Sequence, residues 1–143
     1  MELKNISNLI NQRKFSEAKS RLIELIDKKK KLTTKSTYFN NNYANIYFTL
    51  SHVCNHLNEL ENSKKYIAKH LENNPNDCEA LLLFANLQLR TREIKKAEKN
   101  YRKILKINKK YLPAIVNLAF FYEGIGKIDD AKKYYEIANK IDP

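Results

Sequence analysis

The sequence contains few side chains whose types and spacing suit chemistry. His52 and His56 lie four residues apart, which would place two imidazoles on one face of a helix, as in a metal site. The residues between them are Val53, Cys54 and Asn55, so the glutamate of the H-E-x-x-H motif is missing. No third ligand is evident, and we therefore expect no metal site. The two histidines are better interpreted as the lining of a surface groove.

The other reactive groups do not assemble into a catalytic motif either. Cys54 and Cys78 form no C-x-x-C pair; we expect Cys54 in the core, and Cys78 begins a helix, where the pKa of a thiol can fall. The turn 124–126 contains two glycines but follows no strand, so it is no nucleotide loop. With no nucleophile–base pair and no carboxylate dyad, the sequence predicts a protein that is not an enzyme and needs no cofactor.

Small residues recur along the chain with a fixed period, and they indicate the elements that position everything else. The two series have members 34 residues apart (85 − 51 and 97 − 63) and consist of Ser51, Ala85 and Ala119, and of Ser63, Ala97 and Ala131. A period of this length is typical of stacked helix pairs. The residues are small because the two helices of a pair cross closely there, and a larger side chain would cost about 1–3 kcal/mol.

This pattern resembles the tetratricopeptide repeat from Ala44 to Pro143. The repeat at 112–143 matches best, with signature residues at Ala114, Ile115, Leu118, Ala119, Tyr122, Gly126, Ala131, Tyr135 and Ala138. The resemblance implies an all-α fold, a right-handed α-solenoid of stacked antiparallel helix hairpins. It implies repeats at 44–77, 78–111 and 112–143.

The N-terminal part is interpreted as a further, degenerate repeat. Residues 1–32 show a similar apolar pattern, and an insert at 33–43 breaks the phase before the next repeat. We expect the helix that leads into the next repeat to begin near Thr37. The expected helix pairs are 2–31, 37–73, 78–108 and 112–141, which together form one domain over residues 1–143.

Composition narrows the class of protein. The chain has 143 residues and a net charge of +11, with no apolar run long enough to span a bilayer and no signal-peptide pattern. These features predict a cytoplasmic protein without membrane insertion. Abundant Lys, Asn, Ile and Tyr would follow from an AT-rich genome, so a solvated surface suffices to explain the charge. The alternative interpretation of the charge is an electrostatic field that attracts acidic partners or nucleic acid.

The resemblance also implies a ligand surface, the concave groove formed by the first helix of each pair. Its expected lining is Phe48, His52, Leu82, Asn86, Arg90, Val116, Asn117 and Phe120. The amides of Asn86 and Asn117 suit an extended peptide, since each offers a donor and an acceptor. The predicted function is a non-enzymatic adaptor that binds a peptide or helix of another protein in this groove.

Two alternatives stay open. One is a nucleic-acid-binding helical repeat that uses its basic surface, which the apolar groove and the scarcity of arginine disfavour. The other is a self-assembling structural scaffold. The last helix carries a second apolar stripe, and we expect another chain, a second copy or further residues of the protein to cover it as a C-terminal interface at Tyr134, Ile137 and Ile141.

Overall fold

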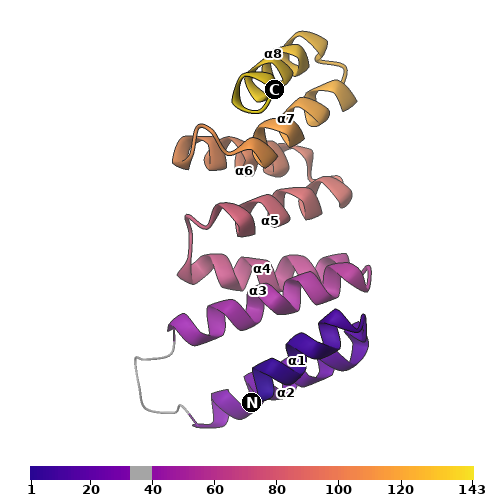
Figure 1. Cartoon of the computed structure of the whole chain (residues 1–143), viewed down its shortest axis with the longest axis vertical. Helices are drawn as coiled ribbons and strands as arrows, with labels where there is room; N and C mark the ends of the chain where they lie inside the picture. Colours follow the sequence, from indigo (N-terminus) through magenta and orange to yellow (C-terminus); the bar gives the residue numbers. More distant parts are fainter. Residues whose placement is uncertain (33–39) are drawn as a thin grey trace. The chain divides into compact units, whose positions relative to one another are not determined.

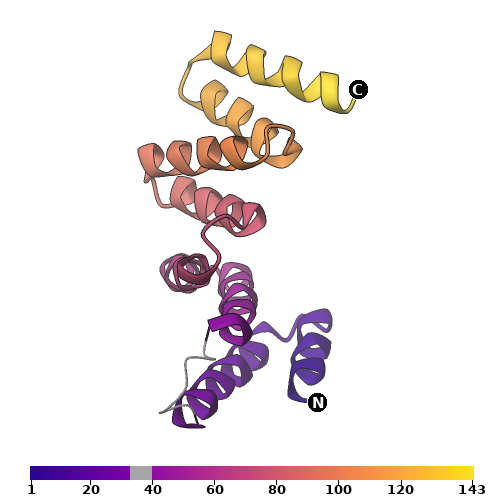
Figure 2. The same ribbon diagram turned by 90° about the vertical axis from the view of Figure 1, so that its left-hand side faces the viewer.

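The computed structural model describes residues 1–32 and 40–143, which form eight α-helices and no strand (Figure 1). The helices are α1 (Glu2–Asn11), α2 (Phe15–Leu32), α3 (Asn40–His56), α4 (Leu60–Asn73), α5 (Cys78–Arg90), α6 (Ile94–Ile107), α7 (Leu112–Gly124) and α8 (Ile128–Ile141). They pack as the consecutive hairpins α1/α2, α3/α4, α5/α6 and α7/α8, and in each hairpin the second helix turns back along the first (Figure 2). The predicted all-α fold of helix hairpins is confirmed.

One expectation cannot be compared with the structure. The predicted start of a helix near Thr37, and positions 33–39 of the predicted insert at 33–43, lie outside the described residues. The described part of the third helix begins at Asn40.

The chain divides into two compact units, Met1–Pro75 with α1–α4 and Asn76–Pro143 with α5–α8. Each unit has a hydrophobic core of its own. In the first unit the core consists of Ile6, Ala18, Leu22, Leu25, Ile26, Ile46, Leu50, Val53 and Cys54. In the second it consists of Ala85, Ala97, Tyr101, Leu118, Phe121, Tyr122 and Ala131.

The periodic small residues lie fully buried at the hairpin crossings. In α3/α4 the hydroxyl of Ser51 donates to the carbonyl of Ser63 (2.9 Å), and the hydroxyl of Ser63 donates to the carbonyl of Ser51 (2.8 Å). Ala85 and Ala97 take the corresponding places in α5/α6, with no exposed surface. The close approach that the sequence predicted is therefore made through hydrogen bonds in one hairpin and through methyl contacts in the next.

The hairpin turns share one backbone conformation. Each contains a residue with positive φ: Arg13 (57°), Asn58 (59°), Arg92 (62°) and Gly126 (77°). In the last turn the N–H of Gly126 donates to the carbonyl of Glu123 (3.0 Å), and the N–H of Lys127 donates to that of Tyr122 (2.8 Å). Equivalent bonds close the other three turns. Glycine and asparagine are the residue types that adopt this conformation most readily, whereas at the two arginines the Cβ is strained.

Candidate protein-interaction surface

The candidate surface lies on α5 and α7, the first helices of the two hairpins in the second unit. Helix α5 begins with a side-chain cap, because the carboxylate of Asp77 accepts hydrogen bonds from the N–H groups of Glu79 and Ala80, both at 3.1 Å. Helix α7 begins with Pro113 in its first turn, where no intrahelical N–H bond is lost. Both helix starts are thus fixed by local sequence.

A hydrogen-bonded group of three side chains joins these helices. Asn117 of α7 donates through Nδ2 to Oδ1 of Asn86 on α5 (2.9 Å). The hydroxyl of Tyr101, on α6, donates to the same oxygen (2.5 Å). Tyr101 is only 1% exposed, and burial raises its pKa to about 12, although the neighbouring Asn117 amide opposes the shift. The phenol is therefore a neutral donor at physiological pH.

These bonds leave polar atoms without a partner. The oxygen of Asn86 accepts two hydrogen bonds, which fills its lone pairs. Within the described residues no group bonds Nδ2 of Asn86 or Oδ1 of Asn117, and both side chains are half-buried. The seam between α5 and α7 thus presents a fixed amide donor beside a fixed amide acceptor. The sequence predicted the two asparagines but did not identify Tyr101 as a part of this surface.

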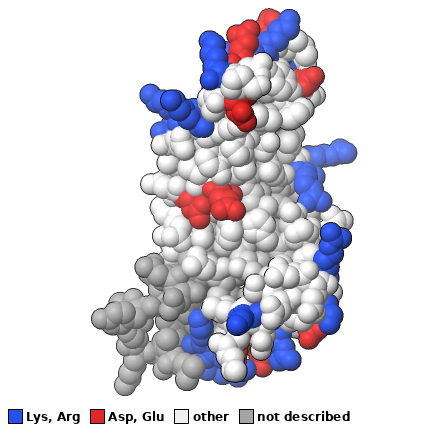
Figure 3. Space-filling view, viewed as in Figure 1, with Lys and Arg blue, Asp and Glu red and all other residues white. Residues whose placement is uncertain are grey.

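Apolar side chains lie on the same two helices. Leu82 and Val116 are half-buried, while Phe120 is 60% exposed and meets the ring of Tyr135 edge-on, with 5.8 Å between ring centroids. In Figure 3 the surface over α5 and α7 is white over much of its area, with a group of acidic side chains at the level of α5 and lysine and arginine side chains at its borders. Exposed Arg90 is in the last turn of α5. These apolar side chains, together with the two amides, make the α5–α7 surface the candidate for protein interaction.

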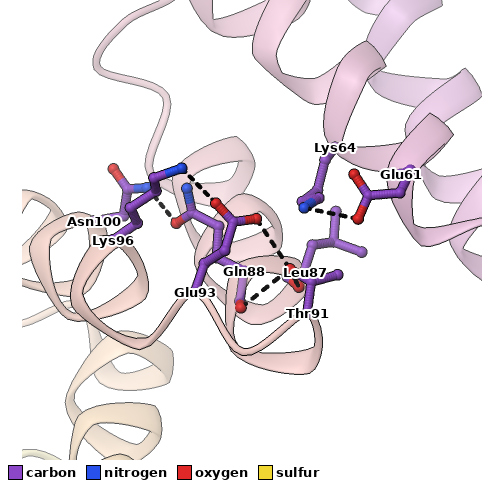
Figure 4. A network of polar contacts seen from close by, with 8 residues as sticks. All are labelled: Glu61, Lys64, Leu87, Gln88, Thr91, Glu93, Lys96 and Asn100. Atoms are coloured by element: carbon purple, nitrogen blue, oxygen red, sulfur yellow. Dashed lines mark hydrogen bonds and ion pairs between the residues drawn. The ribbon is translucent and has the colours of Figure 1, made fainter.

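A polar network fixes the end of α5 (Figure 4). Asn100 of α6 donates to the buried amide of Gln88 (2.8 Å), and Thr91 lies within hydrogen-bond distance of the Glu93 carboxylate (3.1 Å). Glu93 in turn pairs with Lys96 (2.6 Å). These contacts hold the turn between α5 and α6. Lys64 and Glu61, also drawn, form a separate pair along α4 (3.0 Å).

The remaining predicted groove residues, Phe48 and His52, lie on α3 in the first unit. Their rings meet edge-on, with 4.7 Å between ring centroids. Phe48 also contacts the buried imidazole of His70, with 5.1 Å between centroids. His56 stacks on Phe15 of α2, with centroids 4.5 Å apart and an interplanar angle of 2°. The two histidines that the sequence grouped together are therefore held by different aromatic partners.

Both cysteine thiols have raised pKa values. Burial, reinforced by the charge of Asp77, raises the pKa of Cys78, so the lowering that a helix start can cause does not prevail here. Cys54 is fully buried as predicted, and burial raises its pKa to about 11.

On α8, Tyr134 stacks on Tyr122 with centroids 5.6 Å apart, and Ile137 and Ile141 are half-buried. No three potential metal ligands gather anywhere in residues 1–32 and 40–143.

Comparison with known proteins supports this description. The family model of the tetratricopeptide repeat matches residues 44–77, 79–111 and 112–143. No curated protein matches the chain significantly in sequence. In the described part of the chain, no helix is long and apolar enough to cross a membrane.

Several solved structures share the fold. A crystal structure of MamA is 16% identical, with a TM-score of 0.80, over 96% of this chain and 74% of that one. YrrB, described as a tetratricopeptide repeat protein with an unusual peptide-binding site, is 15% identical, with a TM-score of 0.80, over 99% and 68%. PilF of Pseudomonas aeruginosa is 19% identical, with a TM-score of 0.73, over 98% and 59%. At these identities the likeness concerns the fold.

Proposed function

Because the chain belongs to the tetratricopeptide repeat family, we propose that it is a non-enzymatic protein-interaction module whose α5–α7 surface binds an extended polypeptide segment. The bound segment would lie along the seam between the two helices. Its backbone would bond the amides of Asn86 and Asn117, and its side chains would contact Leu82, Val116 and Phe120.

The hydrogen bond between Asn117 and Asn86 carries this proposal. It holds both amides in one orientation, so that a free donor, Nδ2 of Asn86, lies next to a free acceptor, Oδ1 of Asn117. An extended peptide offers N–H and C=O groups in alternation and matches such a pair. Because the amides are already ordered by Tyr101, binding costs little further side-chain entropy.

The apolar residues supply the second part of the proposal. Phe120 exposes 60% of its surface, and its ring is oriented by Tyr135. An exposed aromatic side chain that is held in place is typical of an anchor that dominates binding energy. YrrB, which has the same fold, is described as having a peptide-binding site, which agrees with a peptide ligand here.

Selection from a displayed library of random peptides, followed by calorimetry, tests the proposal. For a selected peptide we expect Asn117→Ala to weaken binding by about 1–3 kcal/mol, because a buried backbone group loses its partner. Phe120→Ala should weaken it comparably. Lys99→Ala, an exposed change on α6, is the control and should have little effect. If Lys99→Ala proves the more damaging variant, the ligand site lies elsewhere.

A further inference from the structure

A second surface of the same unit has a different character. A hollow of about 740 Å³ runs along α6 and is bordered by Tyr134 of α8. Six of its lining residues are cationic, and Glu98 is the one acidic residue among them. The cationic residues are Lys95, Lys99, Arg102, Lys103, Lys106 and Lys109. The α5–α7 surface described above contributes no residue to this lining.

The cations form a stripe rather than a scatter. Lys95, Lys99, Arg102 and Lys106 follow one another at intervals of four, three and four residues, so they share one face of α6. At 1.5 Å per residue the stripe is about 16 Å long. All four side chains are exposed.

Most of this charge is not neutralised within the protein. Glu98 pairs with Arg102 (3.0 Å) and accepts a hydrogen bond from the hydroxyl of Tyr122 (2.7 Å), so its carboxylate is already engaged. Within the described residues no carboxylate pairs with Lys95, Lys99, Lys106 or Lys109. Such a concentration of unpaired like charge attracts a polyanion.

The lining also includes apolar surface. Leu105 and Tyr134 are half-buried, and one face of the Tyr134 ring is covered by Tyr122. A hollow that combines a lysine stripe with an apolar wall suits a ligand with both carboxylates and apolar side chains. Single-stranded nucleic acid is a poorer match, because its sites stack successive bases on several aromatic rings and this hollow has one tyrosine.

We propose that this hollow binds an acidic amphipathic helix of a partner protein, with carboxylates on the lysine stripe and apolar side chains on Leu105 and Tyr134. Carboxylates spaced three and four residues apart on the partner would match the intervals of the stripe. This would be a second interaction surface, independent of peptide binding by α5 and α7.

Fluorescence anisotropy with two labelled probes tests this proposal. The probes are a synthetic amphipathic helix with glutamates at three- and four-residue intervals, and single-stranded poly-U of the same total charge. Lys99→Glu/Lys106→Glu reverses two charges of the stripe, and Lys132→Glu/Lys133→Glu makes the same change in net charge on exposed positions of α8 outside the hollow. Circular dichroism verifies that both variants fold.

We expect the peptide to bind the wild-type protein, with affinity that falls as salt rises. The stripe variant should bind it about tenfold more weakly or worse, and the control less than about threefold more weakly. Asn117→Ala should leave this binding unchanged. Equal losses of peptide affinity in both charge variants would show that binding depends only on the net charge of the protein, which would overturn the proposal. Tighter binding of poly-U, weakened by the stripe variant, would overturn it in favour of nucleic acid, and failure of the peptide to bind at low salt would also overturn it.

Discussion

Asn117 donates a hydrogen bond to Asn86 across 2.9 Å and so joins the first helices of two successive hairpins. The bond uses the acceptor of the Asn86 amide and a donor of the Asn117 amide, which leaves one donor and one acceptor at the seam between α5 and α7. A repeat protein can in this way present an ordered hydrogen-bonding edge to a polypeptide.

Removal of the Tyr101 hydroxyl tests the role of this tyrosine in ordering the seam. Tyr101→Phe should lower the free energy of unfolding by about 0.5–1.5 kcal/mol, because a buried hydrogen bond to Asn86 is lost. Urea denaturation measures the change. The matched control is Tyr135→Phe, whose hydroxyl bonds Glu123 at the exposed surface and should contribute less. Equal effects of the two variants would mean that the buried bond has no special weight.

The hairpin crossings predict a response to added volume. Ala85→Leu and Ala119→Leu should each destabilise the protein by about 1–3 kcal/mol, because both positions are fully buried between packed helices. Lys132→Leu on the exposed side of α8 adds an apolar side chain without such a clash and should change stability by less than about 0.5 kcal/mol. Chemical denaturation that shows no loss for either alanine would contradict the observed packing.

The turns predict opposite effects of two substitutions at equivalent positions. Arg92→Gly should stabilise the protein by about 0.5–1 kcal/mol, since Arg92 adopts a φ of 62° that is strained for any residue with a Cβ. Gly126→Ala should destabilise it by about 1 kcal/mol, because a Cβ is strained at a φ of 77°. The added Cβ would contact nothing within 4 Å, so this backbone strain is the expected cause of the loss. Thermal unfolding compares the two, and changes of the same sign would refute this explanation.

The Glu98 carboxylate predicts a pH dependence of stability. The hydroxyl of Tyr122, together with Arg102, holds the pKa of Glu98 below its ordinary value of 4.5. A lowered pKa in the folded state stabilises the protein above the unfolded pKa, and this contribution is lost as the pH falls through the folded value. Tyr122 stays protonated throughout, because burial and then the bond to Glu98 raise its pKa to about 12.

We therefore expect Glu98→Gln to flatten the loss of stability between about pH 5 and pH 3. Denaturant titrations at several pH values measure this, with Glu136→Gln at an exposed position of α8 as the control. If Glu98→Gln follows the wild-type curve over the whole acidic range, the bond to Tyr122 does not stabilise the folded state.

Much of the fold could be predicted because the period constrains it so strongly. The series Ser51, Ala85 and Ala119, together with the matching series Ser63, Ala97 and Ala131, indicates which helices pair and where they cross. The positive φ at Asn58 and Gly126 followed from residue type. The same conformation at Arg13 and Arg92 gave no such signal, because there the backbone hydrogen bonds of the turn override the preference of the side chain.

The candidate site could be predicted only in part. Residue type and repeat position identified Asn86 and Asn117 as polar positions between apolar neighbours. The sequence does not show that the two amides bond each other, since this depends on the distance between α5 and α7, nor that Tyr101 reaches Asn86 from α6. His56 shows the same limit, because only the packing of α2 against α3 places it on Phe15.

Chemical-shift mapping by NMR with a selected peptide tests the central claim most directly. If the α5–α7 surface is the binding site, shift changes should concentrate in Leu82, Asn86, Val116, Asn117 and Phe120, including the side-chain amides of both asparagines. Residues that line the basic hollow, such as Lys99 and Lys106, should change little with this peptide. Shift changes confined to α6 and α8, or saturation with the two asparagine amides unperturbed, would contradict the account.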